Sequence, residues 1–261
     1  ENNRWWALNE MFSAYDRNLY GVDGFAIDPQ NADVLYVCAG KYPIETAKSW
    51  GLWTKGKADY EPCDVLKTVD RGKSWIHTGL NKDFNGNGDE RMAGEPIMVD
   101  PNNSDIVYVT PRDNKLYRSV NGAESWEEIT TFPEIIPYDI KYTPKNPESK
   151  KGRARGMLID PTSNKDGVSQ TIYISVIGIG VYVTYDAGKS WTLLNGKNAP
   201  TSPKRMAFSA DKKTIYVSAG NGLYRLRNNV WETISPGGPY NYAAVDTDPV
   251  NPDIVYTIRS V

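Results

Sequence analysis

One run of acidic and amide side chains has the spacing of a cation-binding loop. Asp83, Asn85, Asn87 and Asp89 alternate with Phe and Gly, and oxygen ligands in this order form the first half of a calcium loop. The bidentate Glu expected at the twelfth position is replaced by Gly94. A structural calcium site is therefore one prediction for this run and a polar turn is the alternative. The sequence requires no other cofactor.

The chain has few of the groups that nucleophilic or metal catalysis uses. His77 is the only histidine, so a Ser-His-Asp arrangement and a histidine metal cluster lack support, and we expect an ordinary surface position for it. Cys38 and Cys63 are the two cysteines. They lie near the mouth of a hairpin if the apolar runs that contain them pair, and could then form a disulfide. Two separate core residues are the alternative.

Aromatic residues in a long polar segment are candidates for sugar binding. The segment 41–61 contains Tyr42, Trp50 and Trp53. These side chains offer a flat apolar face with a polar edge, which suits the C–H face of a sugar ring. The alternative is that the rings pack on one another and hold the loop in place.

Composition excludes some classes of partner. Lys and Arg number 30 against 32 Asp and Glu, whereas nucleic-acid binding needs clustered positive charge. The densest basic run, within residues 150–155, is expected to be a solvated loop. No apolar run approaches the roughly 18 residues of a membrane span, so no membrane partner is expected. The first residues are Glu-Asn-Asn-Arg, so we expect an export signal to have been removed or to lie outside this sequence.

An eight-residue motif recurs at 68–75, 119–126 and 184–191. It reads Ser/Thr-x-Asp/Asn-x-Gly-x-Ser/Thr-Trp, an Asp box, except that Ala123 replaces the Gly in the middle copy. The Asp or Asn can accept hydrogen bonds from turn amides, the Gly permits a positive φ, and the Trp is expected to pack between neighbouring sheets. We therefore predict structural rather than catalytic roles for Asp70, Gly72, Trp75, Asn121, Trp126, Asp186, Gly188 and Trp191.

A second motif precedes each Asp box and completes the repeat. It is a short apolar strand with an Asp-Pro turn, followed by a strand with a central Tyr, and it begins near residues 26, 98, 158, 208 and 245. Each repeat then reads as four short strands, and four-stranded units in tandem are propeller blades. We predict an all-β fold, a β-propeller of four-stranded antiparallel blades with about four and a half blades visible. The whole of residues 1–261 is expected to be one propeller domain, as a segment of a longer two-propeller protein. Residues 4–8 resemble the last strand of a blade and could close the ring on the fifth unit.

Two segments carry a narrower resemblance. Residues 16–29, DRNLYGVDGFAIDP, resemble the Trp-Asn-Leu-x-Gly-Val-(Asp/Glu)-Ser-(Ile/Leu)-Ala-x-Asp-Pro segment that follows the first blade of glycoside hydrolase family 74. Residues 91–103, RMAGEPIMVDPNN, resemble that family's Gly-Arg-Gly-Met-Gly-Glu-Arg-Leu-Ala-Val-Asp-Pro-Asn stretch, with Arg91, Gly94 and Glu95 aligned. This family comprises xyloglucanases and related endo-β-1,4-glucanases.

The resemblance implies two seven-bladed propellers that face each other across an open cleft, with one catalytic aspartate from each. Such a pair inverts the anomeric centre and needs room for a water molecule. The family's first catalytic aspartate lies in an Ala-Arg-Thr-Asp stretch that this chain lacks, and its partner belongs to the second propeller, so neither catalytic residue is assigned here. The implied substrate contacts are Asn18, Tyr20, Arg91 and Glu95, in addition to the aromatic residues Tyr42, Trp50 and Trp53. For Arg91 and Glu95 an internal ion pair between loops is the alternative.

These expectations combine into one leading hypothesis and two alternatives. The leading hypothesis is a secreted, extracellular or periplasmic glycoside hydrolase that acts on β-1,4-glucan or xyloglucan, with a second propeller of the same protein as its structural partner. The first alternative is a non-catalytic propeller that binds a glycan or a protein. A sialidase-like enzyme is the second, but it needs an arginine triad that grips a carboxylate. Arg112, Arg153 and Arg155 show no recognisable pattern for such a triad.

Overall fold

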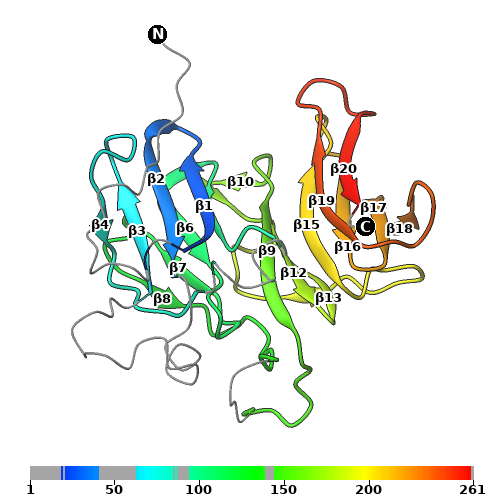
Figure 1. Ribbon diagram of the computed structural model, residues 1–261, viewed down its shortest axis with the longest axis horizontal. Helices are drawn as coiled ribbons and strands as arrows, with labels where there is room; N and C mark the ends of the chain where they lie inside the picture. Colours follow the sequence, from blue (N-terminus) through cyan, green and yellow to red (C-terminus); the bar gives the residue numbers. More distant parts are fainter. Residues whose placement is uncertain are drawn as a thin grey trace.

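The computed structural model describes residue 19 and residues 21–40, 63–84, 86, 94–138 and 144–259. In these residues the named elements are all β-strands, in sheets that follow one another in chain order from β1 to β20 (Figure 1). No helix in this part of the chain has the length and apolar character required to cross a membrane. The predicted all-β class is confirmed.

Four complete blades and the first half of a fifth are present. The bounds are β1 Val22–Asp28, β2 Asn31–Ala39, β3 Asp64–Thr68 and β4 Ile76–His77 for blade 1; β5 Ile97–Asp100, β6 Asn103–Val109, β7 Tyr117–Ser119 and β8 Glu127–Glu128 for blade 2; β9 Arg153–Ile159, β12 Ile172–Ile177, β13 Gly180–Thr184 and β14 Thr192–Leu193 for blade 3; β15 Pro203–Phe208, β16 Thr214–Ala219, β17 Gly222–Arg227 and β18 Val230–Thr233 for blade 4; and β19 Tyr242–Thr247 with β20 Val255–Arg259 for blade 5. Each four-stranded sheet pairs its strands in chain order and antiparallel. A small hairpin, β10 Asn164–Lys165 with β11 Val168–Ser169, is inserted after β9.

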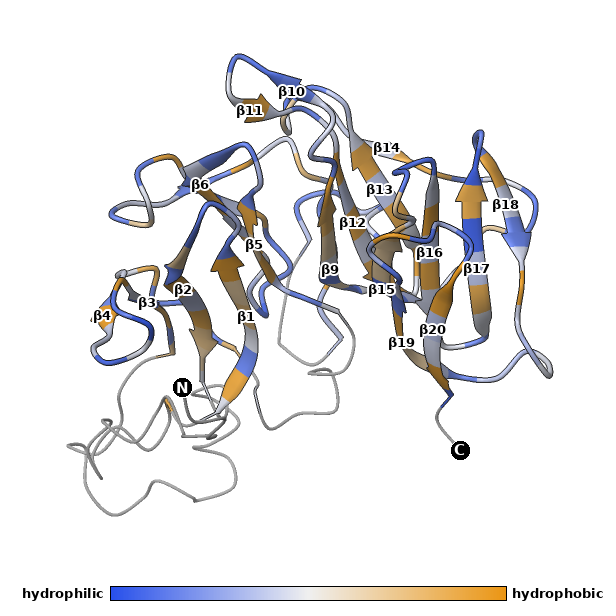
Figure 2. Cartoon of the chain, turned by 90° about the horizontal axis from the view of Figure 1, so that it is seen from above, coloured by the Kyte–Doolittle hydropathy of each residue, from blue (hydrophilic) through white to orange (hydrophobic). Residues whose placement is uncertain are grey.

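The hydrophobic core is divided into layers between neighbouring blades. A tyrosine near the middle of each second strand packs onto the next blade: Tyr36 contributes to the layer between blades 1 and 2, Tyr108 to the next, and Tyr216 to the layer between blades 4 and 5. Apolar residues occupy the strands while the connecting turns are mostly hydrophilic (Figure 2). Because this periodic packing joins successive four-stranded sheets, the predicted propeller architecture is confirmed.

The recurrent turns are held by one hydrogen-bond pattern. In the first copy Thr68 Oγ1 donates to Asp70 Oδ1 at 2.7 Å, and the amide of Ser74 donates to the same carboxylate oxygen at 2.9 Å. The third copy repeats these two bonds around Asp186, at 2.7 and 2.9 Å. In both, hydrogen bonds from the following serine and the preceding threonine lower the pKa of the aspartate to about 2.

The middle copy shows why Ala123 is tolerated. Each turn has two successive residues with positive φ, and the middle copy places its glycine first: Gly122 has a φ of 65° and Ala123 a φ of 68°. The amide of Ala123 still receives its bond, 2.8 Å from Ser119 Oγ. The departure from the motif is therefore a shift of glycine by one position within the same turn geometry.

Two of the three tryptophans that end these turns contact the neighbouring blade, and Trp75 packs within its own. Trp126 in blade 2 donates its indole N–H to Thr78 Oγ1 of blade 1 at 3.2 Å. Trp191 in blade 3 packs edge-to-face on Phe132, with ring centroids 5.1 Å apart. Trp75 packs against the small cluster around Leu66.

The two cysteines are separate core residues and are not joined by a disulfide, which is the second of the two alternatives given above. Cys38 lies in β2 and Cys63 immediately precedes β3, and both side chains are buried and form no disulfide. Burial, with a smaller contribution from Asp23, raises the pKa of Cys38 well above its ordinary value. Both side chains pack within the hydrophobic layer between blades 1 and 2, and no disulfide joins them.

Candidate functional site

The first strands of blades 1, 3 and 4 each begin with an irregularity in their pairing. Pairing of β1 with β2 skips Asp23, and pairing of β9 with β12 skips Arg155. In β15 two residues, Lys204 and Arg205, face only one on β16. Bulges of this kind bend the strand and re-aim a side chain. Because β5, β9, β15 and β19 follow one another in contact, as do β1 and β5, the bulges bring these charged residues into one region.

One pair of these residues is fully buried. Arg155 Nη1 lies 2.8 Å from Asp23 Oδ2 and its Nη2 lies 2.5 Å from Oδ1, and the two side chains are 2% and 0% exposed. The pairing is bidentate and joins residues 132 positions apart in the chain. It therefore ties blade 1 to blade 3 across the intervening blade 2.

A second pair repeats this arrangement one blade further on. Glu95, which precedes β5, accepts from Arg205 Nη1 of β15 at 2.6 Å, and both side chains are about one-third exposed, at 34% and 36%. This pair ties blade 2 to blade 4. Of the two roles considered for Glu95, the ion pair is present, while its contact with a sugar stays a prediction.

A half-buried lysine lies beside the second pair. Lys204 Nζ donates to Asn241 Oδ1, just before β19, at 2.8 Å. Burial lowers the pKa of Lys204. Among the described residues no carboxylate pairs with this ammonium group.

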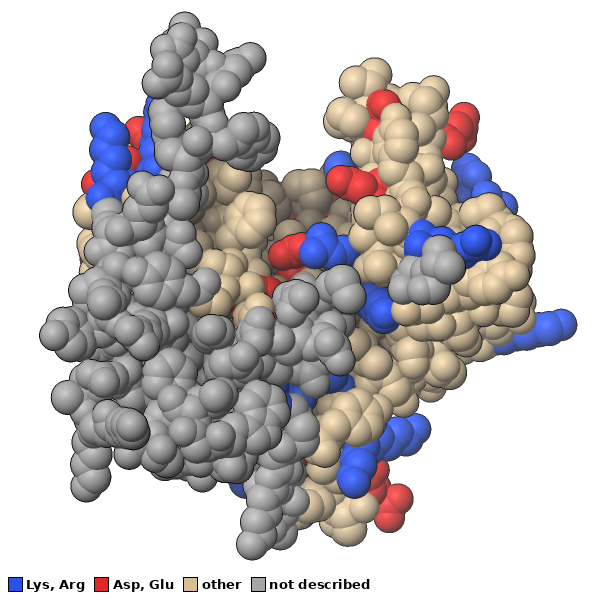
Figure 3. Space-filling model, in the orientation of Figure 1, with Lys and Arg blue, Asp and Glu red and all other residues tan. Residues whose placement is uncertain are grey.

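The pair of Glu95 and Arg205 borders a hollow, which we call the axial hollow. It is a cavity of about 190 Å³ whose lining includes Glu95, Gly156, Arg205, Met206 and Asp246. Figure 3 shows the molecule hollowed between the halves that contain β1 and β19, with acidic and basic side chains visible inside. The arrangement can offer hydrogen-bond donors and acceptors to a polar ligand on a partly apolar floor.

The sequence predicts a solvated loop for the basic run at residues 150–155, and this prediction is wrong for Arg153 and Arg155. Arg153 and Arg155 lie in β9 and are 1% and 2% exposed. Arg153 Nη1 donates to the carbonyl oxygen of Arg112 at 2.8 Å. The charges are tolerated in the interior because distant partners such as Asp23 compensate them, and these partners could not be identified from a local charge count.

The same burial bears on the arginine triad of a sialidase-like enzyme. Arg112, Arg153 and Arg155 are all buried, and Arg155 is already bound to a carboxylate of the chain. Gripping the carboxylate of a substrate would require arginine side chains that face a ligand cavity. The axial hollow instead contains Arg205, which is paired with Glu95.

Most of the sequence-predicted contact residues lie outside the described part of the chain. This holds for Asn18, Tyr20, Tyr42, Trp50, Trp53 and Arg91, and for the predicted calcium ligands Asn85, Asn87 and Asp89. Asp83 is described, and its carbonyl oxygen accepts from the amide of Arg112 at 3.0 Å. Within the described residues no group of three or more His, Cys, Asp or Glu is placed to hold a metal ion.

Two other polar features lie elsewhere in the described residues, the surface around His77 and a cavity beside Phe132. His77 is half exposed, as expected of a surface residue, and its Nδ1 lies 3.2 Å from the buried carboxylate of Asp64. A cavity of about 220 Å³ lies beside Phe132 between loops of blade 2, and Lys115 and Glu128 on its rim pair with each other at 2.6 Å. The axial hollow differs from both features because it brings charged side chains of three blades together, Glu95, Arg205 and Asp246.

Lys204, Arg205 and Asn241 were not among the sequence-predicted site residues. The bulge that displays Lys204 and Arg205 follows from the pairing of β15 with β16 rather than from local composition. An adjacent Lys-Arg pair at the beginning of an apolar strand is the one signal that could have suggested it.

Fold and site together define the class of the protein, a β-propeller of four-stranded antiparallel blades with a polar hollow at the beginnings of its innermost strands. No protein-family model matches the chain. A xyloglucanase of Paenibacillus sp is 30% identical over 250 residues, which cover 92% of this chain and 23% of that protein. A xyloglucanase of Hypocrea jecorina is 28% identical over 235 residues, which cover 83% of this chain and 27% of that protein.

Solved structures agree with these relatives. The glycoside hydrolase family 74 xyloglucanase of Xanthomonas campestris superposes with a TM-score of 0.77 and 28% identity, covering 97% of this chain and 37% of that one. The family 74 enzyme of Niastella koreensis gives a TM-score of 0.72 and 28% identity, covering 94% and 34%. The chain is a propeller portion of the glycoside hydrolase family 74, xyloglucanase-like type. It spans about a quarter of the length of the two curated relatives, 23% and 27%.

Proposed function

We propose that the protein to which this chain belongs is a glycoside hydrolase that cuts the β-1,4-glucan backbone of xyloglucan. The observation that carries the proposal is the similarity to xyloglucanases over 92% and 83% of the chain. The axial hollow supports it, because its carboxylate and guanidinium groups are suited to the hydroxyls of a sugar.

The proposed chemistry is inversion by two aspartates, one from this propeller and one from a second propeller of the same protein. An inverting pair stands roughly 6.5–9.5 Å apart so that a water molecule can enter between them. Neither aspartate is assigned to a residue of this chain. The role of the described residues is then to bind and orient the glucan, and Glu95 is the one previously predicted contact that lies at the hollow.

The proposal includes the setting of the reaction. A polysaccharide substrate lies outside the cell, so we place the protein in the secreted, extracellular or periplasmic space. A structural calcium ion at the run that begins with Asp83 is part of the proposal and is separate from catalysis.

A reducing-sugar assay of the intact protein tests this function. Xyloglucan, mixed-linkage glucan and a sialoside are each incubated with the protein, and the released reducing ends are measured. We expect release from xyloglucan and an inverted anomeric configuration of the first product by NMR. Binding to xyloglucan without release from any substrate would favour a non-catalytic glycan-binding propeller, and release from the sialoside would overturn the proposal.

A further inference from the structure

We propose that the far ends of the innermost strands form a binding pocket for a small phenolic molecule, which we call the axial mouth. In β15 the axial hollow is lined by Arg205, near the beginning of the strand, whereas the axial mouth is lined by Phe208, at its end. The two cavities share Met206, Ala207 and Asp246. The ligand of the axial mouth is separate from the glucan of the proposed function.

The axial mouth is a larger cavity than the axial hollow, about 350 Å³ against about 190 Å³. A proline follows directly after β1, β5 and β9, and Pro29, Pro101 and Pro161 all line the cavity. A cavity of this size and lining suits a small ligand with an apolar body. The other apolar lining residues come from the innermost strands: Met98, Val99, Leu158, Ile159, Met206, Ala207 and Phe208.

Hydrogen bonds between blades hold the walls of the axial mouth. The side chain of Gln30 in blade 1 donates to the carbonyl oxygen of Pro101 in blade 2 at 3.3 Å. The side chain of Asn102 in blade 2 donates in turn to the carbonyl oxygen of Pro161 in blade 3 at 3.0 Å. The three proline turns are therefore joined in succession, and a pocket with walls fixed in this way loses little entropy when a ligand binds.

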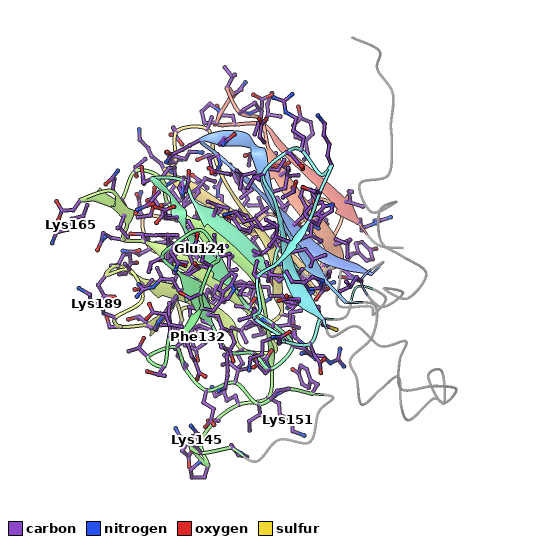
Figure 4. All side chains as sticks on the ribbon, turned by 90° about the vertical axis from the view of Figure 1, so that its left-hand side faces the viewer. Glu124, Phe132, Lys145, Lys151, Lys165 and Lys189 are labelled. Carbon is purple, nitrogen blue, oxygen red and sulfur yellow. The ribbon has the colours of Figure 1, made fainter. Side chains whose placement is uncertain are left out.

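The β10–β11 hairpin supports the same wall from behind. Ser169 in β11 donates its Oγ to Asp100 Oδ1 at 2.6 Å and accepts from Asn102 Nδ2 at 2.8 Å. The tip of the hairpin, with Lys165, lies at the edge of the molecule (Figure 4). No residue of the hairpin lines the cavity, so it braces the proline turns and leaves the axial mouth open.

The apolar lining favours an aromatic ring over a sugar ring. Met98 and Met206 bring two thioether sulfurs, which make favourable contacts with aromatic rings, and Phe208 adds a ring of its own. A sugar carries a hydroxyl group on most of its carbons, and each hydroxyl that is buried without a partner costs free energy. The polar side chains in the lining number too few to satisfy them: Lys212, Asp246 and Thr247.

Two charged side chains of the lining indicate the polar group that the ring carries. Lys212 Nζ lies 5.8 Å from the ring centroid of Phe208 and can donate to an oxygen beside that ring. Asp246 Oδ1 accepts from the amide of Thr247 at 2.8 Å, and its second oxygen can accept a further bond. A phenolic hydroxyl both donates and accepts. Because the two charges are opposite, the ring needs no charge of its own.

Ligand-observed NMR on the intact protein tests the axial mouth with four probes. Phenol should bind with a Kd on the order of 1 mM, a weak affinity in keeping with its few atoms. Anisole cannot donate to Asp246 and cyclohexanol lacks the aromatic face, so each should bind at least about threefold more weakly than phenol. Methyl β-glucoside should not displace phenol. Equal binding of phenol and cyclohexanol, or displacement of phenol by the glucoside, would overturn the phenolic specificity.

Substitutions in the lining place the bound phenol. Lys212→Met and Met98→Gln should each weaken phenol binding about three- to tenfold at an unaltered melting temperature. Lys213→Met is the matched control, because Lys213 is the next residue along the chain and does not line the cavity. The control should bind phenol as the wild type does. Phenol binding that is unchanged in Lys212→Met and in Met98→Gln would show that the axial mouth is not the site.

N-acetyltyrosinamide carries the same ring on a peptide backbone and distinguishes a free molecule from a tyrosine side chain of another protein. It should bind no more tightly than phenol. Binding more than about tenfold tighter would overturn a small molecule as the occupant. None of these measurements uses xyloglucan hydrolysis, so their outcome and that of the proposed function are independent.

Discussion

The buried pair of Asp23 and Arg155 should be the most sensitive link between blades. Replacing Arg155 by methionine removes two charge-assisted hydrogen bonds of 2.8 and 2.5 Å and leaves the Asp23 carboxylate at 0% exposure. Leaving a buried charge without its partner costs about 3–5 kcal/mol. Single domains have a total unfolding free energy of about 5–15 kcal/mol, so we expect a large loss of stability from this one change.

Urea denaturation, followed by tryptophan fluorescence, measures the effect, and hydrogen exchange of the β1 and β9 amides localises it. The double variant Asp23→Asn with Arg155→Met should lose less than the sum of the two single variants, because it leaves no unpaired charge. Arg225→Met is the matched control, since Arg225 pairs with Glu232 on the surface. An exposed pair contributes about 0–1 kcal/mol. If Arg155→Met cost no more than this control, the buried pair would not be the tie between blades 1 and 3 that we infer.

Three further predictions concern the turns, the thiols and the strand contacts. Hydrogen bonds hold the pKa of Asp186 at about 2, below its ordinary 3.8. The stabilisation that its carboxylate gives the turn is therefore complete above about pH 4 and is lost as the pH falls through about 2. Amide chemical shifts in this turn should change at about pH 2, whereas those in the turn of Asn121 should not. Both cysteine thiols are buried and neither forms a disulfide, so a thiol reagent should label neither in the native protein and both after unfolding. Labelling of the native thiols would contradict this. Gly156→Ala would place a Cβ 2.3 Å from a backbone carbonyl oxygen of β15. It should lower the free energy of unfolding, measured by urea denaturation, by about 1–3 kcal/mol. Gly220→Ala is the control and should lower it less, because no atom lies closer than 3.5 Å to the added Cβ.

The blades could be predicted because each repeats the same local chemistry. The Asp-Pro turn, the strand with its tyrosine and the tryptophan-ended turn recur in order, and the structure places strands in these repeats from β1 to β20. The strand expected at residues 4–8 lies outside the described residues. Ala123 departed from the motif in sequence but not in geometry, because Gly122 beside it also has a positive φ. Repeated local patterns of this kind are the part of a fold that sequence reveals best.

The positions of the charged residues on the first strands of the blades could not be predicted in the same way. Arg155 belongs to a basic run, and only its contact with Asp23, 132 residues away, explains its burial. Lys204 and Arg205 are displayed by a bulge that depends on pairing with β16. Both features arise from long-range contacts, whereas motif spacing reports local structure.

A crystal structure of the intact protein with a bound xyloglucan oligosaccharide would test the central claim most directly. We expect a glucosyl residue at the axial hollow, with its hydroxyl oxygens within hydrogen-bond distance of the Glu95–Arg205 pair. An oligosaccharide bound elsewhere, with the hollow filled by side chains of the protein, would contradict the account.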